Sequence, residues 1–136
     1  MPVKNTILFL CSAGGAKSVI AASYFNRLAE DRALPHRAVA AAAEEPYAAV
    51  PGAVADFLER DGFDVRTFQP RRVEEGDVGR AARVVSIECN LEAIDLSGAV
   101  VERWDDVPKV SEDLHGSAAA IRRHVEALAE ELRGGR

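Results

Sequence analysis

The stretch that decides the fold runs from Ile7 to Leu28 and reads ILFLCSAGGAKSVIAASYFNRL. Residues 7–10 are continuously apolar, which is typical of a strand covered on both faces in a parallel sheet. A break at Gly14 and Gly15 follows, and over residues 18–32 the apolar side chains recur at helical spacing. The order of strand, glycine loop and helix predicts the first unit of an α/β fold, in which ligands bind beyond the carboxyl ends of the strands.

The rest of the chain alternates in the same way between strand and helix patterns. We expect strands at residues 38–43, 83–87 and 99–101, and a short strand or the approach to one at 63–67. We expect helices from Pro51 to a cap at Gly62 and over 114–132, and a loop with one helical turn at 71–79. This alternation implies right-handed crossovers, so the sequence predicts a parallel sheet with helices on both faces, as one domain over residues 1–136.

Composition and charge exclude several classes of protein. The 136 residues are 48% hydrophobic and 29% charged, as in an ordinary globular domain. The net charge of -5 argues against nucleic acid or an anionic membrane surface as the main partner, because both demand a basic face. The chain has no apolar run of the length a membrane span needs and no signal-peptide pattern at its start, so we expect a cytoplasmic protein.

The loop between Cys11 and Ser18 is the candidate site. Five small residues separate Cys11 from Lys17, namely Ser12, Ala13, Gly14, Gly15 and Ala16. Small residues let successive N–H groups turn inward as an anion-binding nest, and the following helix directs its positive dipole end at the same point. The same field favours a nucleophilic thiolate at Cys11, and Ser18 is placed to donate to that sulfur. The alternative is a buried cysteine followed by an ordinary glycine turn.

The pattern C-x5-K-S at residues 11–18 resembles the C-x5-R-S motif of the low-molecular-weight protein tyrosine phosphatase superfamily, which includes thioredoxin-linked arsenate reductases. The similarity continues at residues 51–65 and 84–91 and in the loop Trp104-Asp105-Asp106-Val107-Pro108. The resemblance implies a three-layer α/β/α fold with a four-stranded parallel sheet. It also implies hydrolysis of a phosphomonoester through a phosphocysteine, with a phosphate-like oxyanion or a phosphorylated molecule as ligand and with neither metal nor cofactor.

The resemblance also implies roles for individual residues. Cys11 matches the nucleophile, residues 12–16 supply backbone donors, and Ser18 matches the hydroxyl that assists thiolate departure. Asp105 or Asp106 matches the general acid that later activates water, and we favour Asp106 because it is closer to Pro108.

The chain departs from the family pattern at Lys17, which replaces the arginine that grips two phosphate oxygens. A lysine is a point charge without that bidentate geometry, and the chain has 14 Arg but only three Lys. We therefore expect slower catalysis or a different anion. The usual aromatic pair after the acid loop is missing, so Tyr47 and Trp104 are candidates for the substrate wall. The alternatives are a core anchor for Trp104 and a half-exposed loop residue for Tyr47.

Cys89 leaves a second enzymatic interpretation open. It lies near the second redox position of the arsenate reductases, but the chain has no third cysteine to complete their relay. Cys89 is either a buried structural residue or a resolving partner for Cys11, in which case a thiol reductant becomes a possible partner. We therefore carry a phosphatase, an arsenate reductase and a non-catalytic oxyanion-binding module as hypotheses. His124 lies outside the apolar stripe of the last helix, and we expect it to be solvated.

Overall fold

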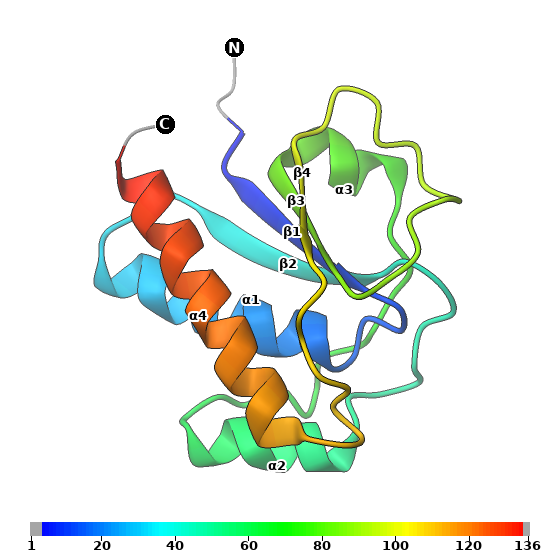
Figure 1. Cartoon of the computed structure of the whole chain (residues 1–136), viewed down its shortest axis with the longest axis vertical. Helices are drawn as coiled ribbons and strands as arrows, with labels where there is room; N and C mark the ends of the chain where they lie inside the picture. Colours follow the sequence, from blue (N-terminus) through cyan, green and yellow to red (C-terminus); the bar gives the residue numbers. More distant parts are fainter. Residues whose placement is uncertain (1–3, 135–136) are drawn as a thin grey trace.

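A computed structural model describes residues 4–134 and has one parallel sheet with helices on both faces (Figure 1). The strands are β1 (Thr6–Cys11), β2 (Arg37–Ala42), β3 (Ala81–Ile87) and β4 (Val101–Trp104). The helices are α1 (Lys17–Asp31), α2 (Gly52–Arg60), α3 (Glu75–Arg80) and α4 (Leu114–Arg133). All strand pairs are parallel and follow the order β2-β1-β3-β4. The predicted three-layer α/β/α class with a four-stranded sheet is confirmed.

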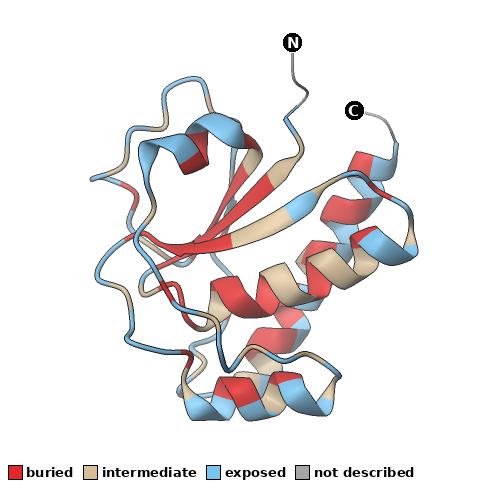
Figure 2. Ribbon diagram, turned by 180° about the vertical axis from the view of Figure 1, so that it is seen from behind, coloured by how far each residue is buried: buried red, intermediate tan, exposed pale blue. Residues whose placement is uncertain are grey.

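The central strand β1 is buried on both faces, which explains its unbroken apolar run (Figure 2). Ile7 and Phe9 belong to a cluster with buried residues of α1, α2 and α4, whereas Leu8 and Leu10 belong to a second cluster with Val78 of α3. β1 therefore lies between β2 and β3 and is covered by side chains on both faces of the sheet. That position fixes the loop that follows it.

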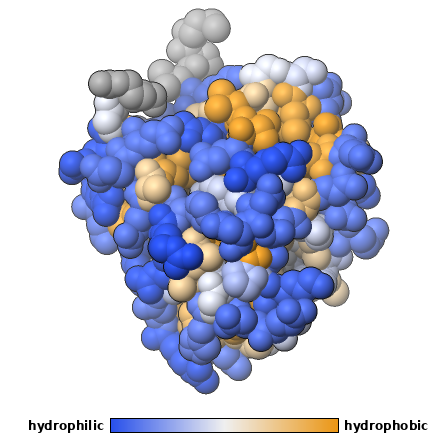
Figure 3. Space-filling view, in the orientation of Figure 1, coloured by the Kyte–Doolittle hydropathy of each residue, from blue (hydrophilic) through white to orange (hydrophobic). Residues whose placement is uncertain are grey.

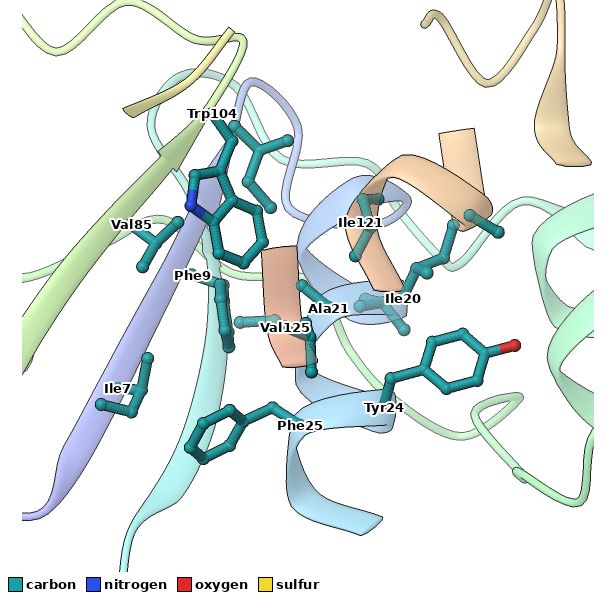
Figure 4. Close-up of a cluster of buried hydrophobic side chains, with 14 of the residues drawn as sticks. Ile7, Phe9, Ile20, Ala21, Tyr24, Phe25, Val85, Trp104, Ile121 and Val125 are labelled. Carbon is teal, nitrogen blue, oxygen red and sulfur yellow. The ribbon is translucent and has the colours of Figure 1, made fainter. Parts of the chain in front are cut away.

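Trp104 at the end of β4 anchors the first cluster (Figure 4). Its side chain is 1% exposed, and its ring centroid lies 5.5 Å from that of Phe9, while Ile121 and Val125 of α4 lie in the same cluster. The close-up shows these side chains between the sheet and the helices. The end of β4 is thereby held against α4.

Two sequence-based expectations for the sheet were wrong. Residues 63–67 form no strand, because Phe63 turns back on α2 through its N–H to Leu58 O (2.9 Å) and packs edge-on against Tyr24. The fourth strand lies at Val101–Trp104 rather than at 99–101, since the bulky Trp104 supplies the buried anchor that the small residues before it lack. The helical turn expected within 71–79 is α3, whose Asp77 is buried and forms two hydrogen bonds with the guanidinium of Arg71.

The surface seen in Figure 3 is mostly hydrophilic. Hydrophobic atoms gather on the side of α3 and of the segment that leads to β4, where Val100 is 59% exposed. None of the helices between residues 4 and 134 is both long and apolar enough to cross a membrane.

Candidate active site

Cys11 ends β1, and its side chain reaches a pocket of about 460 Å³. Its Sγ lies 3.1 Å from Ser18 Oγ, and the Ser18 N–H donates to the same sulfur at 3.4 Å. Ser18 is fully buried in the first turn of α1, so its hydroxyl is held in place by the helix. The sulfur therefore faces a backbone donor, a hydroxyl and the amino end of a helix at one point.

The loop after Cys11 has its carbonyl groups turned away from the pocket. The carbonyls of Cys11, Ser12 and Ala13 accept N–H groups from the segment after β2, at 2.9, 2.9 and 3.1 Å. Gly14 and Gly15 form no hydrogen bond with any residue in the range 4–134, and the cap residue Ala16 offers no side chain to the first turn of α1. The N–H groups of the two glycines have no partner in this part of the chain, as a backbone nest for an oxyanion requires, but neither glycine is among the residues that line the pocket.

The backbone around the loop requires a glycine at position 14, and a side chain at position 15 would displace Tyr47. Gly14 has φ +65°, and a Cβ at this position would lie 2.6 Å from the backbone nitrogen of Ala42. A Cβ on Gly15 would lie 2.8 Å from Tyr47 Cδ2. Tyr47 therefore packs directly on the loop; it is 48% exposed and is one of the residues that line the pocket.

The pocket combines apolar walls with few charges. The predicted residues among those lining it are Cys11, Ser12, Ala13, Ala16, Lys17 and Tyr47, whereas Gly14, Gly15 and Ser18 are not among the lining residues. The charged lining residues are Lys17, Lys109 and Glu88. Apolar lining is provided by Pro51, Ala53, Val54, Ile87, Val110 and Leu114. Within residues 4–134 no group of three or more His, Cys, Asp or Glu side chains is arranged to hold a metal ion.

The structure does not bring Asp105 or Asp106 to the pocket, because neither residue lines it. Asp106 instead accepts a hydrogen bond from His124 of α4 at 2.7 Å, and this bond holds the pKa of the Asp106 carboxyl below its usual value. The His124 ring stacks on Trp104 at 4.7 Å between centroids. His124 is thus half-buried rather than fully solvated, since 31% of its side chain remains exposed.

Trp104, a predicted candidate for the substrate wall, does not line the pocket. Its indole is buried against Phe9 and covered by His124, so it lies outside the pocket lining. Its N–H donates to Glu102 at 2.7 Å. Of the two aromatic candidates, only Tyr47 is in a position to contact a ligand in the pocket.

Glu88 is a pocket residue that the sequence analysis missed. It follows β3 directly with a positive φ of 54°, and its Oε2 accepts the N–H of Val107 at 3.1 Å. This bond ties the end of β3 to the loop after β4. The sequence did carry a signal for it, since an acidic residue just past a buried parallel strand lies at the ligand-binding edge of the sheet.

Cys89 lies on the other face of the sheet from Cys11. It packs with the cluster of Leu8 and Leu10, whereas Cys11 belongs to the first cluster. Its Sγ donates to the carbonyl of Leu10 at 3.6 Å and lies 3.2 Å from Ser86 Oγ. Burial raises the pKa of the Cys89 thiol. Less of this cysteine is therefore present as the nucleophilic thiolate at neutral pH.

Solved structures with a similar fold are known, although their sequences differ widely from this one. No protein-family model and no curated protein sequence matches the chain. A low-molecular-weight protein tyrosine phosphatase from T. tengcongensis has TM-score 0.83 and 17% identity, over 93% of this chain and 98% of that one. A thioredoxin-dependent arsenate reductase from Corynebacterium glutamicum has TM-score 0.80 and 16% identity, over 96% of this chain and 63% of that one.

An arsenate reductase in its phosphate-binding state has TM-score 0.76 and 16% identity, over 93% of this chain and 98% of that one. The chain thus spans less than two thirds of the C. glutamicum enzyme but nearly all of the other two. It has the fold that low-molecular-weight phosphatases and arsenate reductases share.

Proposed function

We propose that the protein is a cysteine-dependent phosphomonoester hydrolase. The observation that carries this proposal is the position of Cys11, which lines a ligand-sized pocket and whose Sγ is within reach of the Ser18 hydroxyl and N–H. An oxyanion-binding module without turnover needs the open N–H groups of Gly14 and Gly15, but it has no use for a nucleophile. A purely structural cysteine does not require a serine hydroxyl and a helix N–H directed at its sulfur.

The reaction follows from this arrangement in two steps. The Cys11 thiolate attacks phosphorus and forms an S–P bond, the P–O bond to the leaving group breaks, and a carboxyl proton passes to the leaving oxygen. Water then attacks the phosphocysteine, gives a proton to the same carboxylate, and the electron pair of the S–P bond returns to sulfur. The Ser18 hydroxyl and N–H stabilise the departing thiolate, while Lys17 and the loop N–H groups bind the phosphate oxygens.

Glu88 takes the role of proton donor in this proposal. Of the described residues that line the pocket it is the acidic one, and its Oε2 is held by Val107 N–H while Oε1 has no partner within residues 4–134. Asp106, which we favoured from the sequence, lies outside the pocket and is kept ionised by His124. An ionised carboxylate that does not face the ligand is a poor proton donor.

Arsenate reduction is a second candidate, favoured by the likeness to arsenate reductases and by the presence of Cys89. The test is to assay p-nitrophenyl phosphate hydrolysis and thioredoxin-coupled arsenate reduction in the wild type, Cys11→Ser and Cys89→Ser. We expect wild-type phosphatase activity that Cys11→Ser abolishes and Cys89→Ser retains. Arsenate reduction that is lost in both variants would favour the reductase, whereas phosphate binding without either activity would favour the binding module.

A further inference from the structure

The pocket holds two of the three lysines of the chain. Lys17 and Lys109 both line it, although Arg outnumbers Lys by 14 to three. The third, Lys4, precedes β1 and so lies at the opposite end of that strand from Cys11. Two amino groups are thus concentrated at one site of a protein with a net charge of -5.

The ammonium group of Lys109 has only a weak ion-pair partner among the described residues. Its only carboxylate neighbour within residues 4–134 is that of Glu112, at 4.0 Å, and the two side chains are 75% and 72% exposed. A pair of this kind is worth little in free energy. The backbone of Lys109 is nevertheless fixed, because its carbonyl accepts the N–H groups of Glu112 and Asp113 at the start of α4. Lys109 thus has a well-positioned backbone and a weakly paired ammonium group, which suits contact with a ligand.

Apolar side chains share the pocket with the two lysines. Tyr47, Val54, Val110 and Leu114 are among the residues that line it. A volume of about 460 Å³ is in the range of small-molecule sites. The two ammonium groups outnumber the carboxylate of Glu88, the acidic residue that lines the pocket. The pocket therefore suits a ligand with an apolar body and negative charge at more than one point.

We propose that Lys109 forms a second anion subsite, so that the preferred substrate is a small phosphomonoester with a further carboxylate or phosphate on its apolar body. The inference rests on the proposed function, in which the loop and Lys17 bind the phosphate that is hydrolysed. Lys109 then binds the second anionic group, and Tyr47 and its apolar neighbours contact the body between them.

The test compares phenyl phosphate with 4-carboxyphenyl phosphate and with hydroquinone bisphosphate, which share one ring and differ in the second charge. We expect KM for at least one doubly charged substrate to lie below that for phenyl phosphate by a factor on the order of five, the scale of a partly exposed ion pair. Lys109→Gln should remove this advantage. Lys4→Gln, which deletes the distant lysine, should keep it. The two doubly charged substrates tell a carboxylate preference from a phosphate preference.

Equal KM values in the wild type, or an advantage that survives Lys109→Gln, would overturn the subsite while leaving phosphatase activity in place. If none of the three esters is hydrolysed, the proposed function fails, and calorimetric binding to Cys11→Ser decides the subsite by itself. Tighter binding of 4-carboxyphenyl phosphate than of phenyl phosphate, lost in Cys11→Ser/Lys109→Gln, supports it. Equal affinities overturn it.

Discussion

Lys17 is the residue at which the loop differs most from the family pattern that it resembles. It starts α1 and lines the same pocket as Cys11. An ammonium group neutralises charge on a bound oxyanion, but it does not hold two equatorial oxygens in one plane as a guanidinium does. We therefore expect Lys17 to support phosphate binding but to stabilise the transition state less than an arginine would.

We predict that Lys17→Arg raises kcat/KM for p-nitrophenyl phosphate by about tenfold, which corresponds to roughly 1.4 kcal/mol of transition-state stabilisation. Lys17→Ala should weaken phosphate binding, because the charge is lost. Steady-state kinetics of both variants test this, with Lys4→Arg as the matched control for adding a guanidinium elsewhere. A rate that falls in Lys17→Arg would indicate a pocket built around the ammonium group, and hence a different substrate.

At the scale of elements, the acid of the reaction depends on which segment supplies a carboxylate to the pocket. The end of β3 supplies Glu88, and the loop after β4 supplies Asp106, which α4 holds through His124. The hydrogen bond from His124 lowers the pKa of Asp106, so this bond stabilises the fold above the unfolded-state pKa and is lost as the pH falls through the lowered value. Near neutral pH, Asp106 is therefore fixed to α4.

We predict that Glu88→Gln lowers kcat for phenyl phosphate by roughly 10²- to 10⁴-fold, the usual scale of general acid catalysis. The loss should be much smaller for 2,4-dinitrophenyl phosphate, whose leaving group needs no proton. Asp105→Asn and Asp106→Asn are the matched controls. A leaving-group-dependent loss in Asp106→Asn, with Glu88→Gln active, would instead mean that the loop moves to bring Asp106 into the pocket.

Most of the elements and the position of Cys11 at the end of a strand could be predicted from the sequence, because burial and loop chemistry are local properties. The run at residues 7–10 and the small residues after Cys11 each dictate their own conformation. The acid side of the site could not be predicted in this way. Whether Asp106 or Glu88 faces the pocket depends on contacts of Trp104, His124 and Val107 that join three separate segments. The bounds of β4 could not be predicted for the same reason, because they depend on the contacts of Trp104 with distant segments.

At the scale of the whole molecule, the loop connects elements that are far apart in the sequence. It joins β1 to α1, and its carbonyls bind the segment after β2, whose strand end also pairs with Arg71 near α3. An oxyanion in the loop therefore contacts a structure that exists only when these parts are folded together. That residues 1–136 form one domain stays a prediction. It implies that the protein unfolds in a single transition and that oxyanion binding shifts the midpoint of this transition.

We predict that inorganic phosphate raises the free energy of unfolding by about 1.4 kcal/mol for each tenfold increase above its dissociation constant, because it binds the folded state alone. Urea unfolding followed by fluorescence of the single tryptophan, Trp104, should give one transition whose midpoint rises with phosphate concentration. Potassium chloride at matched ionic strength controls for screening, and Lys17→Ala should require more phosphate for the same rise. An equal rise with chloride would contradict a specific oxyanion site, and two separate transitions would contradict a single domain.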